Sequence, residues 1–238
     1  MSIDLGLLVI TAASIGFVHT LLGPDHYVPF VAMSAARRWS RARTLWITGL
    51  CGLGHVLGSV AIGAVGIAIG VSLHEIEWLE GFRGDVAAWL LTAFGLAYLV
   101  WGLKKAWRAR PHTHEHVHAD GTSHRHEHGH EGGHLHQHVD AAQARSITPW
   151  ALFVIFILGP CEPLIPVLMY PASQHSAWGT VAVVLAFGTA TIATMLAVVQ
   201  LAVGGLERVP LQAAERYSHA LAGAALSLCG LGIVFLGL

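Results

Sequence analysis

The chain has 238 residues, of which 54% are hydrophobic and only 11% are charged, and its formal net charge is −1. A soluble globular domain carries about 25% charged residues, so this composition excludes an ordinary soluble protein and predicts several membrane-spanning helices. The balanced charge gives no reason to expect nucleic-acid binding. The first residues lack the basic segment of a signal peptide, so we expect the first apolar run to remain as a membrane helix.

Long apolar stretches predict six membrane spans and therefore an all-α fold. The first and fourth spans are broken near their middle, at Gly23-Pro24 and Gly159-Pro160. A break of this kind is tolerated inside a membrane helix where neighbouring groups satisfy the freed backbone. The expected spans cover residues 4–36, 45–73, 85–103, 149–172, 177–204 and 215–238.

The two broken segments resemble each other, which indicates an internal repeat. Leu22-Gly-Pro-Asp-His-Tyr-Val-Pro29 matches Leu158-Gly-Pro-Cys-Glu-Pro-Leu-Ile-Pro166 when one extra residue is allowed. Three spans per half is an odd number, so the halves should form inverted repeats, which are typical of transporters. We expect a first membrane repeat at 1–103, a hydrophilic loop at 104–147 and a second repeat at 148–238.

The basic residues predict the orientation in the membrane. Of the 13 Lys and Arg residues, all except Arg83 lie after the first span, in the central loop, or between the fifth and sixth spans. Cytoplasmic loops carry the excess of basic residues, so both termini should lie outside and the central loop in the cytoplasm. A prokaryotic inner membrane is the expected location.

Ionisable side chains inside the spans are the candidate functional residues, because they are expensive to place in hydrocarbon. His19 and His26 are seven residues apart and would share a helix face, with Asp25 beside the Gly-Pro break. Imidazole and carboxylate groups suit first-row transition metals. Cys161 and Glu162 occupy the repeat positions of Asp25 and His26. The predicted metal site comprises His19, Asp25, His26, His55, Cys161 and Glu162.

The central loop holds 11 of the chain's 17 histidines in a low-complexity stretch. Such a segment cannot bury apolar surface, so we expect it to be largely disordered without a ligand. Histidine-rich tracts of this kind are typical of metal binding, which predicts an auxiliary site. Its histidines are His112, His114, His116, His118, His124, His126, His128, His130, His134, His136 and His138.

The motif His19-x5-Asp25-His26, with His55 after paired glycines, six spans and a cytoplasmic His-rich loop, resembles the NicO-type nickel/cobalt transporters. That group is related to urease accessory permeases and to nickel/cobalt uptake permeases, whose motif has one residue fewer between the ligands. The resemblance implies metal efflux with Ni²⁺ or Co²⁺ as cargo and His19, Asp25 and His26 as metal contacts. The residues alone imply a divalent transition metal, Zn²⁺ and Fe²⁺ included.

We therefore predict a transporter, not an enzyme, that exports a divalent metal ion by alternating access through a His/Asp site at the membrane midplane. A proton is the hypothesised counter-ion. We expect no permanently bound cofactor. The expected partners are the transported metal ion and the lipid bilayer, and nucleic acid is not expected.

One alternative is a thiol-based carrier. The segment 159–163, Gly-Pro-Cys-Glu-Pro, also looks like the Pro-Cys motif of six-span thiol-disulfide electron carriers used in cytochrome c maturation. Those carriers need one cysteine in each half, whereas the matching position of the first half here carries Asp25. Cys51 could substitute only if it lies close to Cys161, and a reversible bridge between the two would distinguish this alternative.

A sulfite-type anion exporter is a second alternative, because such permeases share inverted repeats. An anion site would use Lys, Arg or helix N-termini. We expect no Lys or Arg inside any span, whereas Asp25 and Glu162 are inside, and this disfavours an anion. A metal sensor that binds without transport is a third alternative, and the breaks in both halves favour alternating access over it.

Overall fold

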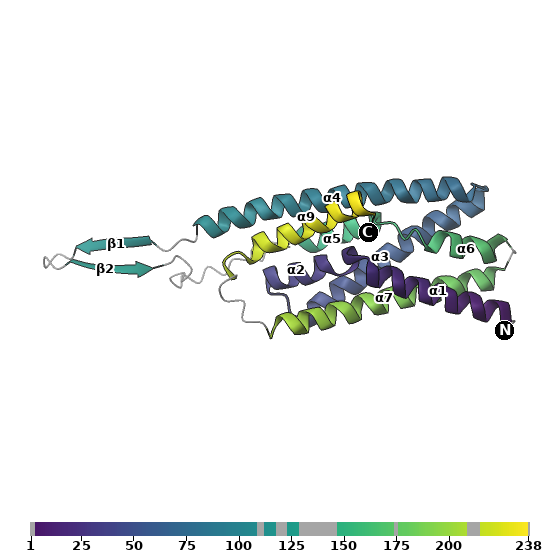
Figure 1. The fold of residues 1–238 in the computed structure, drawn as a ribbon, viewed down its shortest axis with the longest axis horizontal. Coiled ribbons are helices and arrows are strands. Elements are labelled where there is room, and N and C mark those ends of the chain that lie inside the picture. Colours follow the sequence, from purple (N-terminus) through teal and green to yellow (C-terminus); the bar gives the residue numbers. More distant parts are fainter. Residues whose placement is uncertain are drawn as a thin grey trace.

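The computed structural model describes residues 3–108, 112–117, 123–128, 147–173, 176–208 and 215–237. It is an elongated bundle of helices with a two-stranded hairpin beyond one end (Figure 1). The elements are α1 Ile3–Leu22, the single 3₁₀ turn η1 Pro24–His26, α2 Val28–Arg37, α3 Arg41–Ile69, α4 Leu73–Arg108, β1 His112–Val117, β2 Ser123–His128, α5 Ile147–Leu158, α6 Leu164–Ser173, α7 Ala177–Leu206 and α9 Ser218–Leu236.

Five helices are long and apolar enough to cross a membrane: α1, α3, α4, α7 and α9. The helices α2 and α6 have 10 residues each and α5 has 12. A straight crossing needs about 20 residues, so none of these three could span the bilayer alone. Outside the hairpin every described element is helical, which confirms the prediction of an all-α membrane protein.

Both helix breaks lie where the sequence predicts them, at Gly23-Pro24 and Gly159-Pro160. A proline has no N–H to donate and its ring clashes with the carbonyl one turn earlier, so α1 ends at Leu22 and α5 at Leu158. After the first break, α2 begins with Pro29 in its first turn, where a proline costs no hydrogen bond. The main chain is therefore non-helical at two points inside the bundle.

Each broken span packs against a long helix from the other half of the chain. Gly16 of α1 lies against Phe187 of α7, and Gly54 of α3 lies against Ile157 of α5. The absence of a side chain at Gly16 and Gly54 lets these helices approach closely, as small residues do in membrane bundles. The two breaks are thereby held in the interior of one bundle.

The long helices pair across the halves in antiparallel directions. Gly52 of α3 lies against Met195 of α7. One turn further along α3, Val56 lies against Gly188, which comes two turns before Met195 in α7, so the two helices run in opposite directions. The helices α4 and α9 also run antiparallel to each other, and they lie side by side along most of α9 (Figure 1). Large apolar side chains such as Leu201 remain exposed on the outer faces, where lipid would cover them.

The helix α4 begins earlier than the sequence predicts. We expected this span to start near residue 85, but the helix runs from Leu73 and is 36 residues long, about 54 Å at 1.5 Å per residue. Charged residues between 75 and 85 interrupt the hydropathy of this stretch without interrupting the helix. The extra turns bring Glu80 and Arg83 into the bundle.

The central segment contains β1 and β2, paired antiparallel with His112 opposite His128 and His116 opposite His124. This differs from the disorder expected without a ligand. Alternating His residues give the segment a period of two, which is compatible with strands. The predicted auxiliary ligands that lie outside the described residues are His118, His130, His134, His136 and His138.

Polar contacts join the helix ends nearest the hairpin. Arg41, at the start of α3, forms an ion pair with Glu207 at the end of α7. Arg37 Nη2 of α2 donates a hydrogen bond of 2.8 Å to Oγ1 of Thr148 in α5. These contacts connect four helix ends that the sequence assigns to one side of the membrane.

Candidate functional site

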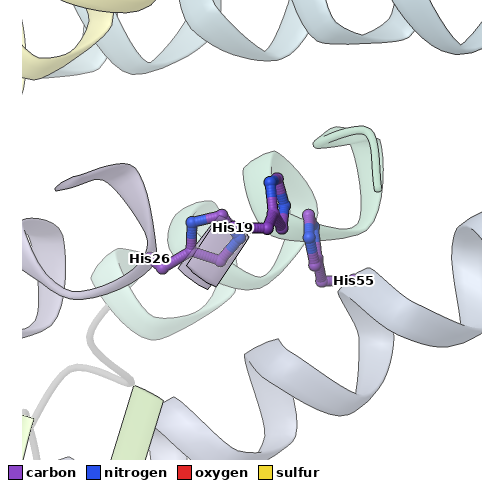
Figure 2. A group of neighbouring side chains, drawn as sticks. All are labelled: His19, His26 and His55. Atoms are coloured by element: carbon purple, nitrogen blue, oxygen red, sulfur yellow. The ribbon is translucent and has the colours of Figure 1, made fainter. Parts of the chain in front are cut away.

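Three histidines from separate segments meet inside the bundle (Figure 2). His19 lies in the last turn of α1, His26 in η1 and His55 in α3. The ring centroids of His19 and His26 are 4.7 Å apart and those of His26 and His55 are 5.1 Å apart, both edge to face. One ring nitrogen from each histidine lies within 4.8 Å of the corresponding nitrogens of the other two. The break at Gly23-Pro24 makes this possible, because η1 places His26 between α1 and α3.

Asp25 orients the His26 ring. Nδ1 of His26 lies 3.0 Å from Oδ1 of Asp25 and 3.2 Å from the carbonyl oxygen of Gly23. Both neighbours accept hydrogen bonds, so Nδ1 carries a proton and donates it. The Nε2 atom of His26 is then left with a free lone pair. Asp25 acts on the site through this hydrogen bond and is not itself grouped with the three rings.

Each histidine of the cluster has a buried Nε2 atom without a hydrogen-bond partner among the described residues. The Nε2 atoms of His19, His26 and His55 are buried and make no hydrogen bond to any described residue. His26 is 1% exposed and His55 is 2% exposed. The three rings are therefore held close together with nitrogen atoms that could bind a ligand.

The structure leaves Cys161 and Glu162 outside this histidine cluster. Cys161 is fully buried in an apolar cluster that also contains Ala12 and Phe187. Its main-chain N–H donates a hydrogen bond of 3.0 Å to Oγ of Ser59 in α3. Glu162 is exposed beside the second helix break. Of the six predicted metal-site residues, the three histidines form the cluster, Asp25 contacts it through His26, and the other two lie outside it.

A cavity of about 950 Å³ opens beside the histidine cluster. His19, Asp25 and His55 line it, together with Asp85 of α4 and Glu162. The cavity therefore connects the histidine cluster with the second helix break. Three carboxylates and no Lys or Arg are among its described lining residues, so it favours a cation over an anion.

Sequence reasoning missed a buried ion pair beside the second break. Glu80 is 0% exposed and pairs with Arg83, one turn later on α4. Oε2 of Glu80 accepts a hydrogen bond of 2.7 Å from Oγ of Ser59. Nη2 of Arg83 donates to the carbonyl oxygens of Ile157 and Gly159, at 2.9 Å and 3.1 Å. The pair thereby satisfies backbone groups freed by the break, and it places an Arg within a helix that is long and apolar enough to cross a membrane. The i, i+3 spacing of opposite charges was the available signal.

Comparison with known proteins gives one match. A family model described as the transmembrane region of cytochrome c biogenesis proteins matches residues 28–237. This range includes His55 and all three cysteines, and it begins just after His26. No curated protein matches the chain, and no solved structure matches it.

The match overturns two predictions made from the sequence. The assignment to the NicO-type nickel/cobalt transporters is wrong, because the matched family is a different one. The function inferred with it, export of Ni²⁺ or Co²⁺, is wrong for the same reason. The matched description agrees instead with the thiol-disulfide alternative raised by the Pro160-Cys161 segment.

Proposed function

The chain belongs to the family of cytochrome c biogenesis transmembrane proteins, and on that premise we propose that it carries reducing equivalents across the membrane by thiol-disulfide exchange. The observation that carries the proposal is the extent of the match, which covers residues 28–237 and includes both Cys51 and Cys161. The spanning helices supply the membrane setting that such a carrier needs.

Cys161 is the thiol that the proposal makes reactive. It follows Pro160 directly at the second break, where the main chain between α5 and α6 is not helical. Its N–H donates to Oγ of Ser59 in α3 and lies 3.3 Å from Oε2 of Glu80 in α4. The residue therefore sits where three parts of the bundle meet, and a relative movement of these parts would change its surroundings.

The exchange uses two thiols and conserves electrons. The Cys161 thiolate attacks a disulfide of a partner protein, which forms a mixed disulfide and releases one partner thiol. The Cys51 thiolate then attacks the Cys161 sulfur, releases the second partner thiol and leaves a Cys51–Cys161 disulfide. Two electrons and two protons pass to the partner, and a partner dithiol on the other side of the membrane reduces the chain again.

A second conformation is part of this proposal. The described cysteines are free, and Cys51 lies eight residues before Ser59, about 12 Å along the α3 axis. Ser59 is the residue that holds the N–H of Cys161. Forming the bridge therefore requires the α5–α6 break to move along α3.

The proposed architecture is a pair of inverted three-span repeats. In it, α5 and α6 together form one crossing, as α1 and α2 do in the first half, which gives six crossings. The antiparallel pairing of α3 with α7, and of α4 with α9, supports this arrangement. Corresponding helices of two halves with opposite topology must run in opposite directions.

The proposed orientation places the hairpin in the cytoplasm and both termini outside. The described basic residues other than Arg83 lie at the helix ends nearest the hairpin or, for Arg125, in the hairpin itself. Arg83 is mostly buried and paired with Glu80 on a helix, so we do not count it as a charge in an external loop. The positive-inside rule then has no opposing charge in this chain.

Complementation tests the proposed function. A strain lacking this gene would express the full chain, or the chain with Cys51→Ser, Cys161→Ser or Cys229→Ser, and c-type cytochromes would be detected by haem staining. We expect the unaltered chain to restore them and Cys51→Ser and Cys161→Ser to lose at least tenfold. Cys229→Ser is the matched control, because Cys229 is also a buried, free cysteine and the proposed exchange does not use it.

As a control, each variant must be present in the membrane at the same level as the unaltered chain. Restoration by Cys161→Ser to the level of Cys229→Ser would exclude thiol exchange at Cys161. Normal c-type cytochromes in the strain without any copy of the gene would exclude a requirement in cytochrome c maturation.

A further inference from the structure

We infer that His19, His26 and His55 form a binding site for a divalent first-row transition-metal ion. The inference does not rest on the proposed thiol exchange, because none of the three cysteines belongs to the cluster. It rests on the unpartnered nitrogens, on the hydrogen bond that orients His26, and on the cavity beside the rings.

The first step concerns the unpartnered nitrogens. Almost all buried polar atoms in proteins have a hydrogen-bond partner. Here the Nε2 atoms of His19, His26 and His55 are buried without one, in a single cluster. His26 and His55 are at least nine-tenths buried. A structural histidine in a helical core would direct its free nitrogen to a carbonyl or hydroxyl, whereas these three face one another.

The second step concerns the orientation of His26. A histidine that binds a metal through one nitrogen almost always donates its other N–H to a carboxylate or carbonyl oxygen. Nδ1 of His26 has both, from Asp25 at 3.0 Å and from Gly23 at 3.2 Å. The hydrogen bonds fix the tautomer that leaves Nε2 free to bind, and they reduce the movement available to the ring.

The third step concerns distance. Metal–imidazole bonds are about 2.0–2.1 Å long, so two nitrogens bound to one ion in a tetrahedral arrangement lie about 3.4 Å apart. The cluster has its three nitrogens within 4.8 Å of one another. Closing the site around an ion therefore shortens the longest of these separations by up to about 1.4 Å, a change that rotation of the three rings can share.

The fourth step concerns access. His19 and His55 line the cavity of about 950 Å³, so an ion bound to the three rings keeps a coordination position open to it. Asp25, Asp85 and Glu162 line the same cavity and attract cations toward it. Three imidazoles with one open position suit Zn²⁺, Fe²⁺, Ni²⁺ and Cu²⁺.

Metal titration of the purified full-length protein tests the site. The His-rich loop would bind metal itself, so the reference protein is a full-length variant with the 11 loop histidines replaced by serine. Co²⁺ is the probe, followed by its visible d–d absorption, and Zn²⁺ competes for the same site. We expect one equivalent of Co²⁺ per chain, displaced by one equivalent of Zn²⁺.

Variants in the same background locate the ion. His55→Gln and His19→Gln should each weaken Co²⁺ binding by at least 100-fold, and Asp25→Asn by about 10- to 100-fold through the freed His26 ring. His74→Gln, at an exposed position on α4, and Cys161→Ser should leave binding unchanged. Thermal unfolding of each variant in detergent checks that it is folded.

Two results would overturn the inference. The first is a folded reference protein with no saturable Co²⁺ band. The second is equal affinity in folded His19→Gln, His55→Gln and His74→Gln proteins. Loss of metal binding with intact thiol exchange, or the reverse, separates this inference from the proposed function.

Discussion

The carboxylate of Glu80 and the guanidinium of Arg83 take the place of the hydrogen bonds that α5 loses at its break. Arg83 donates to two carbonyl oxygens at the end of α5, while Glu80 accepts from Ser59 and lies 3.3 Å from the N–H of Cys161. Removing one partner of a buried pair leaves an uncompensated charge, which costs far more than removing both. The pair therefore holds the second break in its observed form.

Glu80→Gln should destabilise the protein by about 3–5 kcal/mol, the range for breaking a buried ion pair from one side. The double variant Glu80→Gln with Arg83→Gln should recover part of that loss, because it leaves no buried charge. Thermal and denaturant unfolding in detergent measure both. If the double variant lost more unfolding free energy than the two single variants lose together, Glu80 and Arg83 would not be a compensating pair.

The residues of the histidine cluster could be predicted from the sequence, whereas the burial of the ion pair could not, although its i, i+3 spacing was visible. His19, His26 and His55 stand out because polar residues are rare in apolar runs, and the Gly-Pro break indicates where they gather. Glu80 and Arg83 lie in a stretch that reads as a polar boundary between spans. Only the packing of α5 against α3 and α4 buries them, and a contact between distant segments leaves no local pattern.

The helices α4 and α9 approach each other closely, and glycines permit it. A Cβ on Gly223 of α9 would collide with the main chain of Leu99 in α4, and one on Gly95 of α4 would collide with Ser227. Small residues of this kind allow dispersion contacts between helix backbones, which drive helix association in lipid. The pairing of α4 with α9 joins the ends of the two halves.

Gly223→Ala should therefore lower the unfolding temperature, because the added methyl group forces the two helices apart. The matched control is Gly204→Ala in α7, where no atom lies within 4 Å of the new Cβ. The control should be neutral or stabilising by about 0.5–1 kcal/mol, the helix preference of Ala over Gly. Equal effects of the two substitutions on thermal unfolding would contradict close packing at Gly223.

Helix boundaries were predicted well where a proline sets them and poorly where charge is mixed with helix formers. The breaks at Gly23-Pro24 and Gly159-Pro160 follow from the chemistry of proline alone. The start of α4 at Leu73 could not be predicted in this way. The hydropathy of the polar stretch 75–85 is typical of a loop, although its residues favour a helix. The strands near the centre of the chain were also missed, since low complexity was taken as disorder.

A surface ion pair between α3 and α7 makes a pH-dependent contribution to the stability of the fold. Hydrogen bonds from Arg41 lower the pKa of Glu207, so the contribution to stability is full above the unfolded-state pKa and disappears as pH falls through the lower folded-state value. Arg41→Gln should reduce the unfolding temperature slightly at pH 7, because the pair is exposed. The difference from the unaltered protein should vanish in acid, and a difference that persists at pH 2 would contradict this assignment.

On the scale of the whole molecule, the charge distribution defines one side. The proposed orientation places Ser123 of the hairpin in the cytoplasm and Ser72, between α3 and α4, outside. Ser123→Cys should react with a membrane-impermeant maleimide in inside-out vesicles but not in intact cells, and Ser72→Cys should do the opposite. The native cysteines are buried, so they add little background. The reverse labelling pattern would invert the proposed orientation.

The measurement that tests the central claim most directly is the redox state of Cys51 and Cys161 in living membranes. Cells would be quenched in acid, alkylated before and after reduction, and the peptides identified by mass spectrometry, with Cys229 as the internal reference. Thiol carriage predicts a fraction of chains with a Cys51–Cys161 disulfide that grows when the reducing partner is depleted and disappears on its return. Cysteines that remain fully reduced in both conditions, as Cys229 should, would contradict it.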